Sequence, residues 1–261
     1  MKTILIISYY FPPAGGGGVQ RILKLLKYAD HSKFRFKLIC AVNPGISVND
    51  SKLTGDIPEN VEIHRVVSKP PHEKFQRNQT KIYETSFFIR LISSFIFIPD
   101  SRVSWTNQVL NYLQEKSELL EDVKLILATM PPFSSGVLAY KIKQKYGIPY
   151  ILDYRDGWKY NPFQIYPTFI HSAIQRKMES RILTQSQGVV FVNRSLQNTC
   201  LEKFSSIPWQ KIKSRVIYNG FDEEDYSHLQ KVEKLPSLDL NIGLPGTIYF
   251  REPAPSPFFV I

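Results

Sequence analysis

The chain has 261 residues, of which 43% are hydrophobic, enough to bury the core of one large or two modest domains. This composition excludes a disordered chain. Lys and Arg number 33 against 23 Asp and Glu, and the formal charge of +10 favours anionic partners. Charge alone does not choose between nucleotide phosphates, nucleic acid and an acidic membrane surface.

The cysteines and histidines give no sign of a disulfide or a metal centre. Cys40 falls in a predicted strand and Cys200 in a predicted helix, so we expect reduced core residues and a cytosolic setting. The five histidines have no metal-ligand spacing, and we expect no bound metal. No apolar run reaches the roughly 18–20 residues that span a bilayer. The nearest, 87–98, is interrupted by an arginine and two serines.

The first 30 residues contain the strongest local pattern. An apolar run at 3–8 predicts a buried parallel strand, four glycines follow at 15–18, and an amphipathic segment at 19–30 predicts a helix. The first turn of that helix has no carboxylate, so its positive dipole end can attract an anion by roughly 0.3–1 kcal/mol. We predict an anion site here, and the alternative is a simple tight turn.

Strands and helices alternate along most of the remaining chain. We expect further strands at 36–42, 61–67, 123–129, 149–153 and 189–192, and helices at 105–120, 133–146, 168–187 and 195–204, the last capped by Ser195. Gly147 suits a helix C-terminus. Because parallel strands need crossover helices, we predict an α/β fold, a doubly wound, mostly parallel Rossmann-like sheet with ligands at the carboxyl ends of its strands.

One segment, 69–102, breaks the alternation. It has a polar stretch followed by apolar residues at helical spacing, and Pro99 ends this helical pattern. Excursions of this length are usually binding flaps or peripheral packing elements. Contact of the apolar stripe with a membrane is the less favoured alternative to packing in the core.

Two polar segments follow the predicted strands at 123–129 and 149–153. In 153–158 two carboxylates and an arginine stand where the strand ends, and such groups can orient sugar hydroxyls and hold a phosphate. The alternative is an Asp-Arg pair that only fixes the loop. In 129–134 two prolines fix the backbone, and Ser134 or Ser135 is expected to cap the next helix.

The motifs of other enzyme classes are missing. Gly18 is followed by Val19 and Gln20, so the Lys and Ser or Thr of a P-loop are absent, and the third glycine and the acidic residue of a dinucleotide fingerprint are absent too. Residue order and context suggest no Ser-His-Asp or Cys-His arrangement, so hydrolysis by a nucleophile has little support.

Four segments together resemble a known family. The segments 10–21, 128–134, 153–158 and 216–222, in this order, resemble the N-terminal domain of family 4 glycosyltransferases of the GT-B fold. The resemblance implies two facing Rossmann-like domains, retention of anomeric configuration, no required metal and a nucleotide-sugar donor bound mainly by the second domain. That donor is a substrate, and no cofactor is implied.

The resemblance also implies a domain division. We expect a Rossmann-like glycosyltransferase N-terminal domain at 1–218, with 70–104 as an acceptor flap, an interdomain linker at 219–241, and the first strand of a donor-binding domain at 242–261. The rest of such a domain would need roughly 100–150 more residues. We therefore expect this chain to be incomplete alone, either as a truncated product or as half of a split enzyme.

The implied activity is transfer of a sugar from a nucleotide-sugar donor to a glycan or lipid-linked acceptor in polysaccharide biosynthesis. The catalytic candidates are Asp156 and Arg155, in orienting the acceptor. Binding of substrate or donor phosphate is expected from Gly15, Gly16, Gly17, Gly18, Arg21, Asp153, Trp158 and Asn219.

Location and partners follow from the same resemblance. We expect a cytoplasmic protein, peripheral at the inner face of the cell membrane, and no nucleic-acid partner. The alternative is a non-catalytic subunit that recruits a separate donor-binding chain to an anionic membrane surface. A dinucleotide-dependent enzyme is disfavoured by the absent fingerprint.

Overall fold

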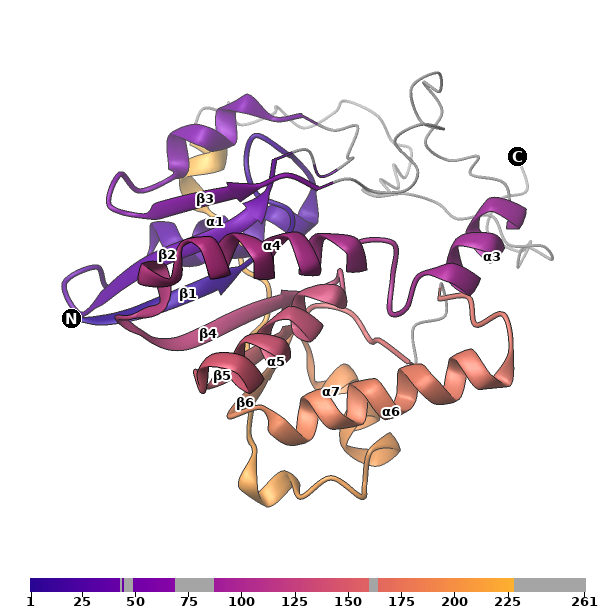
Figure 1. Ribbon diagram of the computed structural model, residues 1–261. Coiled ribbons are helices and arrows are strands. Elements are labelled where there is room, and N and C mark those ends of the chain that lie inside the picture. The colour runs from indigo at the N-terminus through magenta and orange to yellow at the C-terminus, as the bar shows by residue number, and fades with distance from the viewer. Residues whose placement is uncertain (43, 45–48, 69–86, 160–163, 228–261) are drawn as a thin grey trace, which may run out of the picture. The chain divides into compact units, whose positions relative to one another are not determined.

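The computed structural model describes residues 1–42, 44, 49–68, 87–159 and 164–227 of a chain that divides into two units, Met1–Phe221 and Asp222–Ile261. In the first unit seven parallel strands form one sheet in the order β3-β2-β1-β4-β5-β6-β7 (Figure 1). The strands are β1 (Lys2–Ile7), β2 (Phe34–Ala41), β3 (Glu62–Val66), β4 (Val123–Met130), β5 (Tyr150–Tyr154), β6 (Gly188–Phe191) and β7 (Lys213–Val216). Of the second unit 222–227 are described, with a 3-10 turn, η5 (Glu223–Tyr226).

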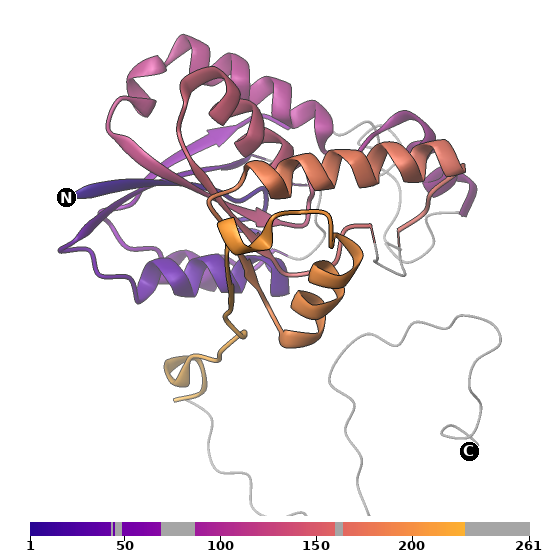
Figure 2. The same cartoon turned by 90° about the horizontal axis from the view of Figure 1, so that it is seen from below.

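The α-helices connect these strands. They are α1 (Gly17–Lys27), α3 (Phe87–Ile96), α4 (Val103–Glu115), α5 (Ser134–Tyr146), α6 (Phe169–Gln185) and α7 (Arg194–Lys203), with short 3-10 helices η1 (Ser51–Asp56), η3 (Ser117–Leu120) and η4 (Trp209–Lys211) in the first unit. Figure 2 shows α1 on one side of the sheet, and α4 and α5 on the other. The strand order reverses between β1 and β4, so the chain leaves these neighbours toward opposite faces.

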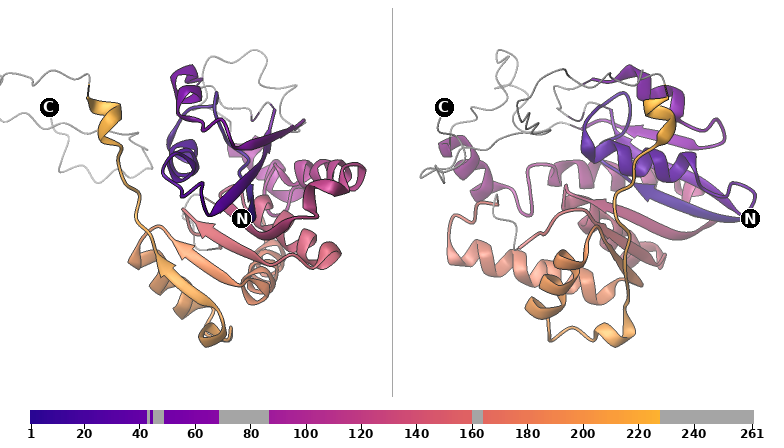
Figure 3. Two further views of the ribbon diagram at one scale, coloured as in Figure 1. Left: turned by 90° about the vertical axis from the view of Figure 1, so that its left-hand side faces the viewer. Right: turned by 180° about the vertical axis from the view of Figure 1, so that it is seen from behind.

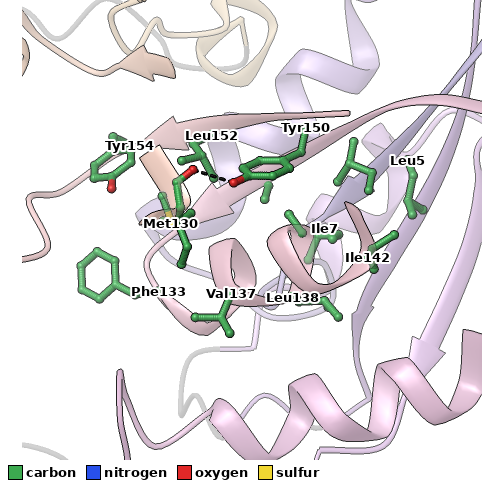
Figure 4. Close-up of a cluster of buried hydrophobic side chains, with 14 of the residues drawn as sticks. Leu5, Ile7, Met130, Phe133, Val137, Leu138, Ile142, Tyr150, Leu152 and Tyr154 are labelled. Atoms are coloured by element: carbon green, nitrogen blue, oxygen red, sulfur yellow. Dashed lines mark hydrogen bonds between the residues drawn. The ribbon is translucent and has the colours of Figure 1, made fainter. Parts of the chain in front are cut away.

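Each face of the sheet has its own apolar core. On the α1 face, side chains at helical spacing are fully buried: Val19, Ile22, Leu23 and Leu26. Figure 4 shows part of the core on the opposite face, where side chains of α5 pack between those of β1, β4 and β5. The hydroxyl of Tyr150 donates a hydrogen bond to the carbonyl of Ile182, so this buried polar group is satisfied.

The predicted fold class is confirmed: the domain is a Rossmann-like α/β domain with a parallel sheet. Gly147 caps α5 with a φ of 74°, as expected. The cap expected for α7 was wrong, because Asn193, not Ser195, takes the extended conformation and accepts a hydrogen bond from the Leu196 amide at 2.7 Å. The edge strand β7, in orange beside β6 in Figure 3, was not predicted.

Several predictions fall partly or wholly outside the described residues. They include 70–86 of the expected flap, 228–241 of the expected linker and the expected strand within 242–261. The domain division therefore stays a prediction. Both cysteines are buried free thiols, as expected. Across the described ranges, every helix is too short or too polar to cross a bilayer.

Candidate functional site

The glycine loop ends at the N-terminus of α1. Gly16 is the N-cap residue and has a φ of 95°, a conformation that residues with a Cβ rarely adopt. No side chain caps the helix, and its first turn has no acidic residue, as the sequence indicates. Gly15 is buried, whereas Gly16 and Gly17 are exposed. The positive end of the α1 dipole therefore opens toward solvent through two small residues.

Arg155 lies against this loop. A Cβ added to Gly18 would stand 2.8 Å from Nη1 of Arg155, so the absence of a side chain there lets the guanidinium approach the helix. The backbone N–H of Arg155 donates to the carbonyl of Met130 at 2.9 Å, and its Nη2 donates to the carbonyl of Pro131. These contacts hold the guanidinium between the loops that follow β1 and β4, at the switch point of the sheet.

The Arg155 side chain keeps one hydrogen-bond donor unused. Its Nε is buried and has no hydrogen-bond partner among the described residues. Burial lowers the pKa of the guanidinium, and the carboxylates of Asp153 and Asp156 oppose this effect. An arginine keeps its charge in such a setting. The unpaired N–H and the positive charge are features that an anionic ligand would satisfy.

Arg21 of α1 forms a nearly buried ion pair with Asp153 at the end of β5. Nη2 and Nε of Arg21 lie 2.9 and 3.0 Å from Oδ1 of Asp153, and Nε lies 3.1 Å from Oδ2. The exposed fractions of the two side chains are 11% and 4%. The hydroxyl of Thr129 donates to the same carboxylate at 2.9 Å. The carboxylate of Asp153 is therefore satisfied by its own protein.

The same guanidinium reaches the segment that follows β7. Nη1 of Arg21 donates to Oδ1 of Asn219 at 3.0 Å and to the carbonyl of Tyr218 at 3.3 Å. Arg21 thus joins α1, the end of β5 and residues that follow the edge strand. Gly18, Arg155 and Asp153 complete this cluster, so the structure brings the glycine loop and the 153–158 turn together.

Asp156 and Trp158 occupy different environments in that turn. Asp156 is exposed and makes no hydrogen bond or salt bridge within the described part of the chain. The indole of Trp158 is 1% exposed, stacks on Phe133 with ring centroids 4.9 Å apart, and donates to Gln175 at 2.7 Å. The structure gives Trp158 a packing role, and its contact with substrate stays a prediction.

A buried carboxyl group, Glu179 of α6, lies behind the turn and was missed by the sequence analysis. It lines a cavity of about 10 Å³, roughly the space of one water molecule, with Trp158, Cys200 and other side chains. Burial raises the pKa of Glu179 to about 8, against hydrogen bonds from the Lys159 backbone N–H at 3.1 Å and the Tyr154 hydroxyl at 3.3 Å. The available signal in the sequence was its position three and four residues before Ile182 and Leu183, which places it on the apolar face of the helix.

The N-terminus of α5 is capped from a distant part of the chain. Asp100 accepts hydrogen bonds from the backbone N–H of Ser134 at 3.0 Å and from its hydroxyl at 2.8 Å. The expectation that Ser134 or Ser135 caps this helix was wrong, since both lie inside its first turn and Phe133 holds the N-cap position. Asp100 places a negative charge at the positive end of α5.

Comparison with known proteins gives structural matches. Neither a protein-family model nor a curated protein matches the chain. The N-terminal domain of trehalose-6-phosphate phosphatase from Candida albicans is similar in structure, with a TM-score of 0.52 and 11% identity over 87% of this chain and 50% of that chain. Sucrose-phosphate synthase from Thermosynechococcus elongatus has a TM-score of 0.48 and 12% identity, over 86% of this chain and 49% of that one. UGT2 from Phytolacca americana has a TM-score of 0.48 and 11% identity, over 84% of this chain and 52% of that one.

At these identities the likeness concerns the fold alone. The chain has a Rossmann-like α/β domain similar to one half of a GT-B structure, and it spans about half the length of the solved chains it matches. The finer assignment to family 4 stays a prediction.

Proposed function

We propose that this domain is the acceptor-side half of a glycosyltransferase that uses a nucleotide-sugar donor. The observation that carries the proposal is the meeting of two anion-attracting groups at the switch point of the sheet. One is the uncapped N-terminus of α1, and the other is the guanidinium of Arg155 with its unpaired Nε. A diphosphate suits both, because helix N-termini and arginine forks are common phosphate-binding groups.

The remaining residues divide into holding and contacting roles. Asp153 fixes Arg21, and through it the glycine helix, while the exposed carboxylate of Asp156 is available to orient an acceptor hydroxyl. The acceptor in this proposal is a glycan or a lipid-linked sugar in polysaccharide biosynthesis, handled at the cytoplasmic face of a membrane. The matched chains are about twice as long as the part that this chain covers. We therefore propose that sugar transfer requires a donor-binding domain in addition to this one.

Titration of the purified chain tests the proposal. UDP-glucose, GDP-mannose and NAD are added separately, and binding is followed by amide chemical shifts or by calorimetry. We expect at least one of the nucleotide sugars to bind, weakly because one domain is involved, with shifts in the glycine loop. Arg155→Ala should reduce that affinity about tenfold, the value of a charged hydrogen bond of roughly 1.5 kcal/mol.

Matched variants keep the experiment interpretable. Arg215→Ala removes an exposed guanidinium from the edge strand and should leave the affinity unchanged within about twofold. Arg155→Lys retains the charge and should fall between the wild type and Arg155→Ala. Tight binding of NAD with no response to either nucleotide sugar would contradict the proposal and favour a dinucleotide-dependent enzyme.

A second candidate function is a non-catalytic subunit that brings a separate donor-binding chain to an anionic membrane. Exposed apolar side chains on α3, including Phe95 and Ile96, favour it. The two functions differ in the role of Asp156. Asp156→Asn should lower sugar transfer by the chain combined with a donor-binding domain if this domain takes part in the reaction, and should leave it unchanged if the domain only recruits.

A further inference from the structure

Two helices that are distant in the sequence expose apolar side chains side by side. The C-terminal half of α3 and the first turns of α6 lie next to each other in Figures 1 and 3. The imidazole of His171 packs edge-on against the ring of Phe95, with centroids 4.9 Å apart. We name the exposed apolar residues here the α3–α6 patch; they are Ile92, Phe95, Ile96, Phe169, Ile170 and Ile174.

The side chains of the patch are much more exposed than side chains that pack in a core. Phe169 is 82% exposed and Ile96 is 66% exposed, whereas the buried side of α6 is formed by residues such as Gln175, Ile182 and Leu183. Large apolar side chains that gather at one place on a surface commonly mark an interaction site, and isolated ones do not. The excursion expected to be a flap or a packing element therefore exposes part of its apolar stripe.

The same face of α6 is basic beyond its first turns. Ile170, Ile174, Lys177 and Arg181 follow one another at intervals of four, three and four residues, which places them along one stripe of the helix. Both basic side chains are exposed. The one acidic residue of α6, Glu179, is buried on the other side, so the solvent face of this helix has only positive charges.

The patch lies at the edge of the sheet where the candidate site is found. The loop after β5 contains Asp156 and leads into α6, so the first turns of α6 begin at the carboxyl ends of the strands. Figure 1 shows α3 beyond that same edge. The patch and the turn that contains Asp156 therefore both lie toward the carboxyl ends of the strands.

We propose that the α3–α6 patch, together with Lys177 and Arg181, is a docking surface for an anionic lipid bilayer. Apolar side chains enter the interfacial region, and nearby basic side chains attract anionic headgroups, a combination that suits a bilayer better than a neutral protein surface. Docking itself does not depend on nucleotide binding. The added step, in which the bilayer presents a lipid-linked acceptor near Asp156, rests on the proposed function.

Vesicle flotation with the full chain tests this surface, in the absence of any nucleotide. We expect binding to vesicles that contain phosphatidylglycerol and much weaker binding to phosphatidylcholine alone. Lys177→Glu with Arg181→Glu should lower the partition coefficient at least tenfold, since each basic residue near an anionic surface contributes about fivefold. Phe169→Ser with Ile170→Ser should lower it about tenfold through lost apolar contact.

Control variants change the same chemistry elsewhere. Lys2→Glu with Lys33→Glu makes the same charge change at two exposed residues of the opposite sheet edge, where the Lys2 amide donates to the Lys33 carbonyl, and should retain most of the binding. Tyr28→Ser removes a 60% exposed aromatic residue from the end of α1 and should retain binding too. Circular dichroism checks that each variant is folded.

Two results would overturn the docking proposal. One is equal loss of binding in the control and patch variants, which would mean that overall charge is responsible. The other is a dimer in light scattering that Phe169→Ser with Ile170→Ser dissociates, while vesicles bind no chain, because a second copy would then cover the patch. Either result leaves the nucleotide-sugar titration unaffected, so the two proposals fail separately.

Discussion

Replacing Asp153 by Asn tests whether the buried ion pair stabilises the fold. The carboxylate accepts hydrogen bonds from Nε and Nη2 of Arg21 and from the hydroxyl of Thr129. Asn keeps the size of the side chain but loses the charge and replaces one acceptor by an NH₂ group. Removing one partner of a buried pair typically costs about 3–5 kcal/mol. Arg21 retains Asn219 as a partner, so we expect a loss of about 2–4 kcal/mol.

Urea unfolding of a double-mutant cycle measures the pair itself. The cycle contains the wild type, Asp153→Asn, Arg21→Gln and the double variant, with equal m-values required across the four. We expect a coupling free energy of about 2 kcal/mol. Lys33 and Asp30 form an exposed salt bridge of 2.7 Å and serve as the matched control, in which we expect no resolvable coupling.

A small coupling would refute the reasoning. If the Arg21–Asp153 coupling were below about 0.5 kcal/mol, the pair would behave as an ordinary surface salt bridge. Water would then reach the two charges in solution, although the side chains of Arg21 and Asp153 are only 11% and 4% exposed in the structure. The view that Arg21 holds α1 against the end of β5 would have to be abandoned.

Three further changes have expected outcomes. Burial raises the pKa of Glu179 to about 8, above its value in the unfolded chain, so the free energy of unfolding should fall as pH rises from about 5 to 8, by up to roughly 1.4 kcal/mol per pH unit. In urea unfolding, Glu179→Gln should lack this pH dependence. The same pH dependence in the variant and the wild type would contradict a buried acid. Gly16→Ala should cost about 1–2 kcal/mol in thermal unfolding because φ is 95°, whereas Gly17→Ala, with open space around it, should cost nothing. Asp100→Ala should cost about 1–2 kcal/mol by removing the hydrogen bonds to Ser134, and an unchanged melting temperature would argue against the cap.

The sequence was sufficient for the elements with strong periodicity or turn chemistry. The buried strands, the glycine loop, the uncapped helix that follows it and the Gly147 cap all depend on local preferences, and the structure has each of them. The strand β7 was missed because its four residues, Lys213–Val216, are mostly polar and show no apolar run. Short edge strands are defined by pairing with a neighbour, here β6, rather than by their own composition.

The contacts of the candidate site depend on strand order, which local patterns do not encode. Arg21 and Asp153 are 132 positions apart, and they meet because β4 places the end of β5 beside β1 at a defined spacing. The sequence analysis assigned both residues to ligand binding, and its alternative was an Asp-Arg pair within the turn that only fixes the loop. The cap by Asp100 was not predicted for the same reason, because Asp100 is distant in the sequence from the helix that it caps. Ser134 and Ser135 are near the start of that helix and have side chains of a type that caps helices, so they were chosen instead.

Some polar side chains of the candidate site already have hydrogen-bond partners and others have none, and this difference indicates which residues a ligand would contact. Asp153 has its lone pairs occupied by Arg21 and Thr129, so a sugar hydroxyl would have to displace a charged partner to reach it. Asp156 is exposed, so its carboxylate can contact a ligand without breaking an existing bond, whereas the unpaired Nε of Arg155 is buried and can be reached only if its surroundings move. We therefore expect substitutions at Asp153 to lower stability, whereas Asp156→Asn should leave the urea midpoint unchanged and act on ligand binding alone.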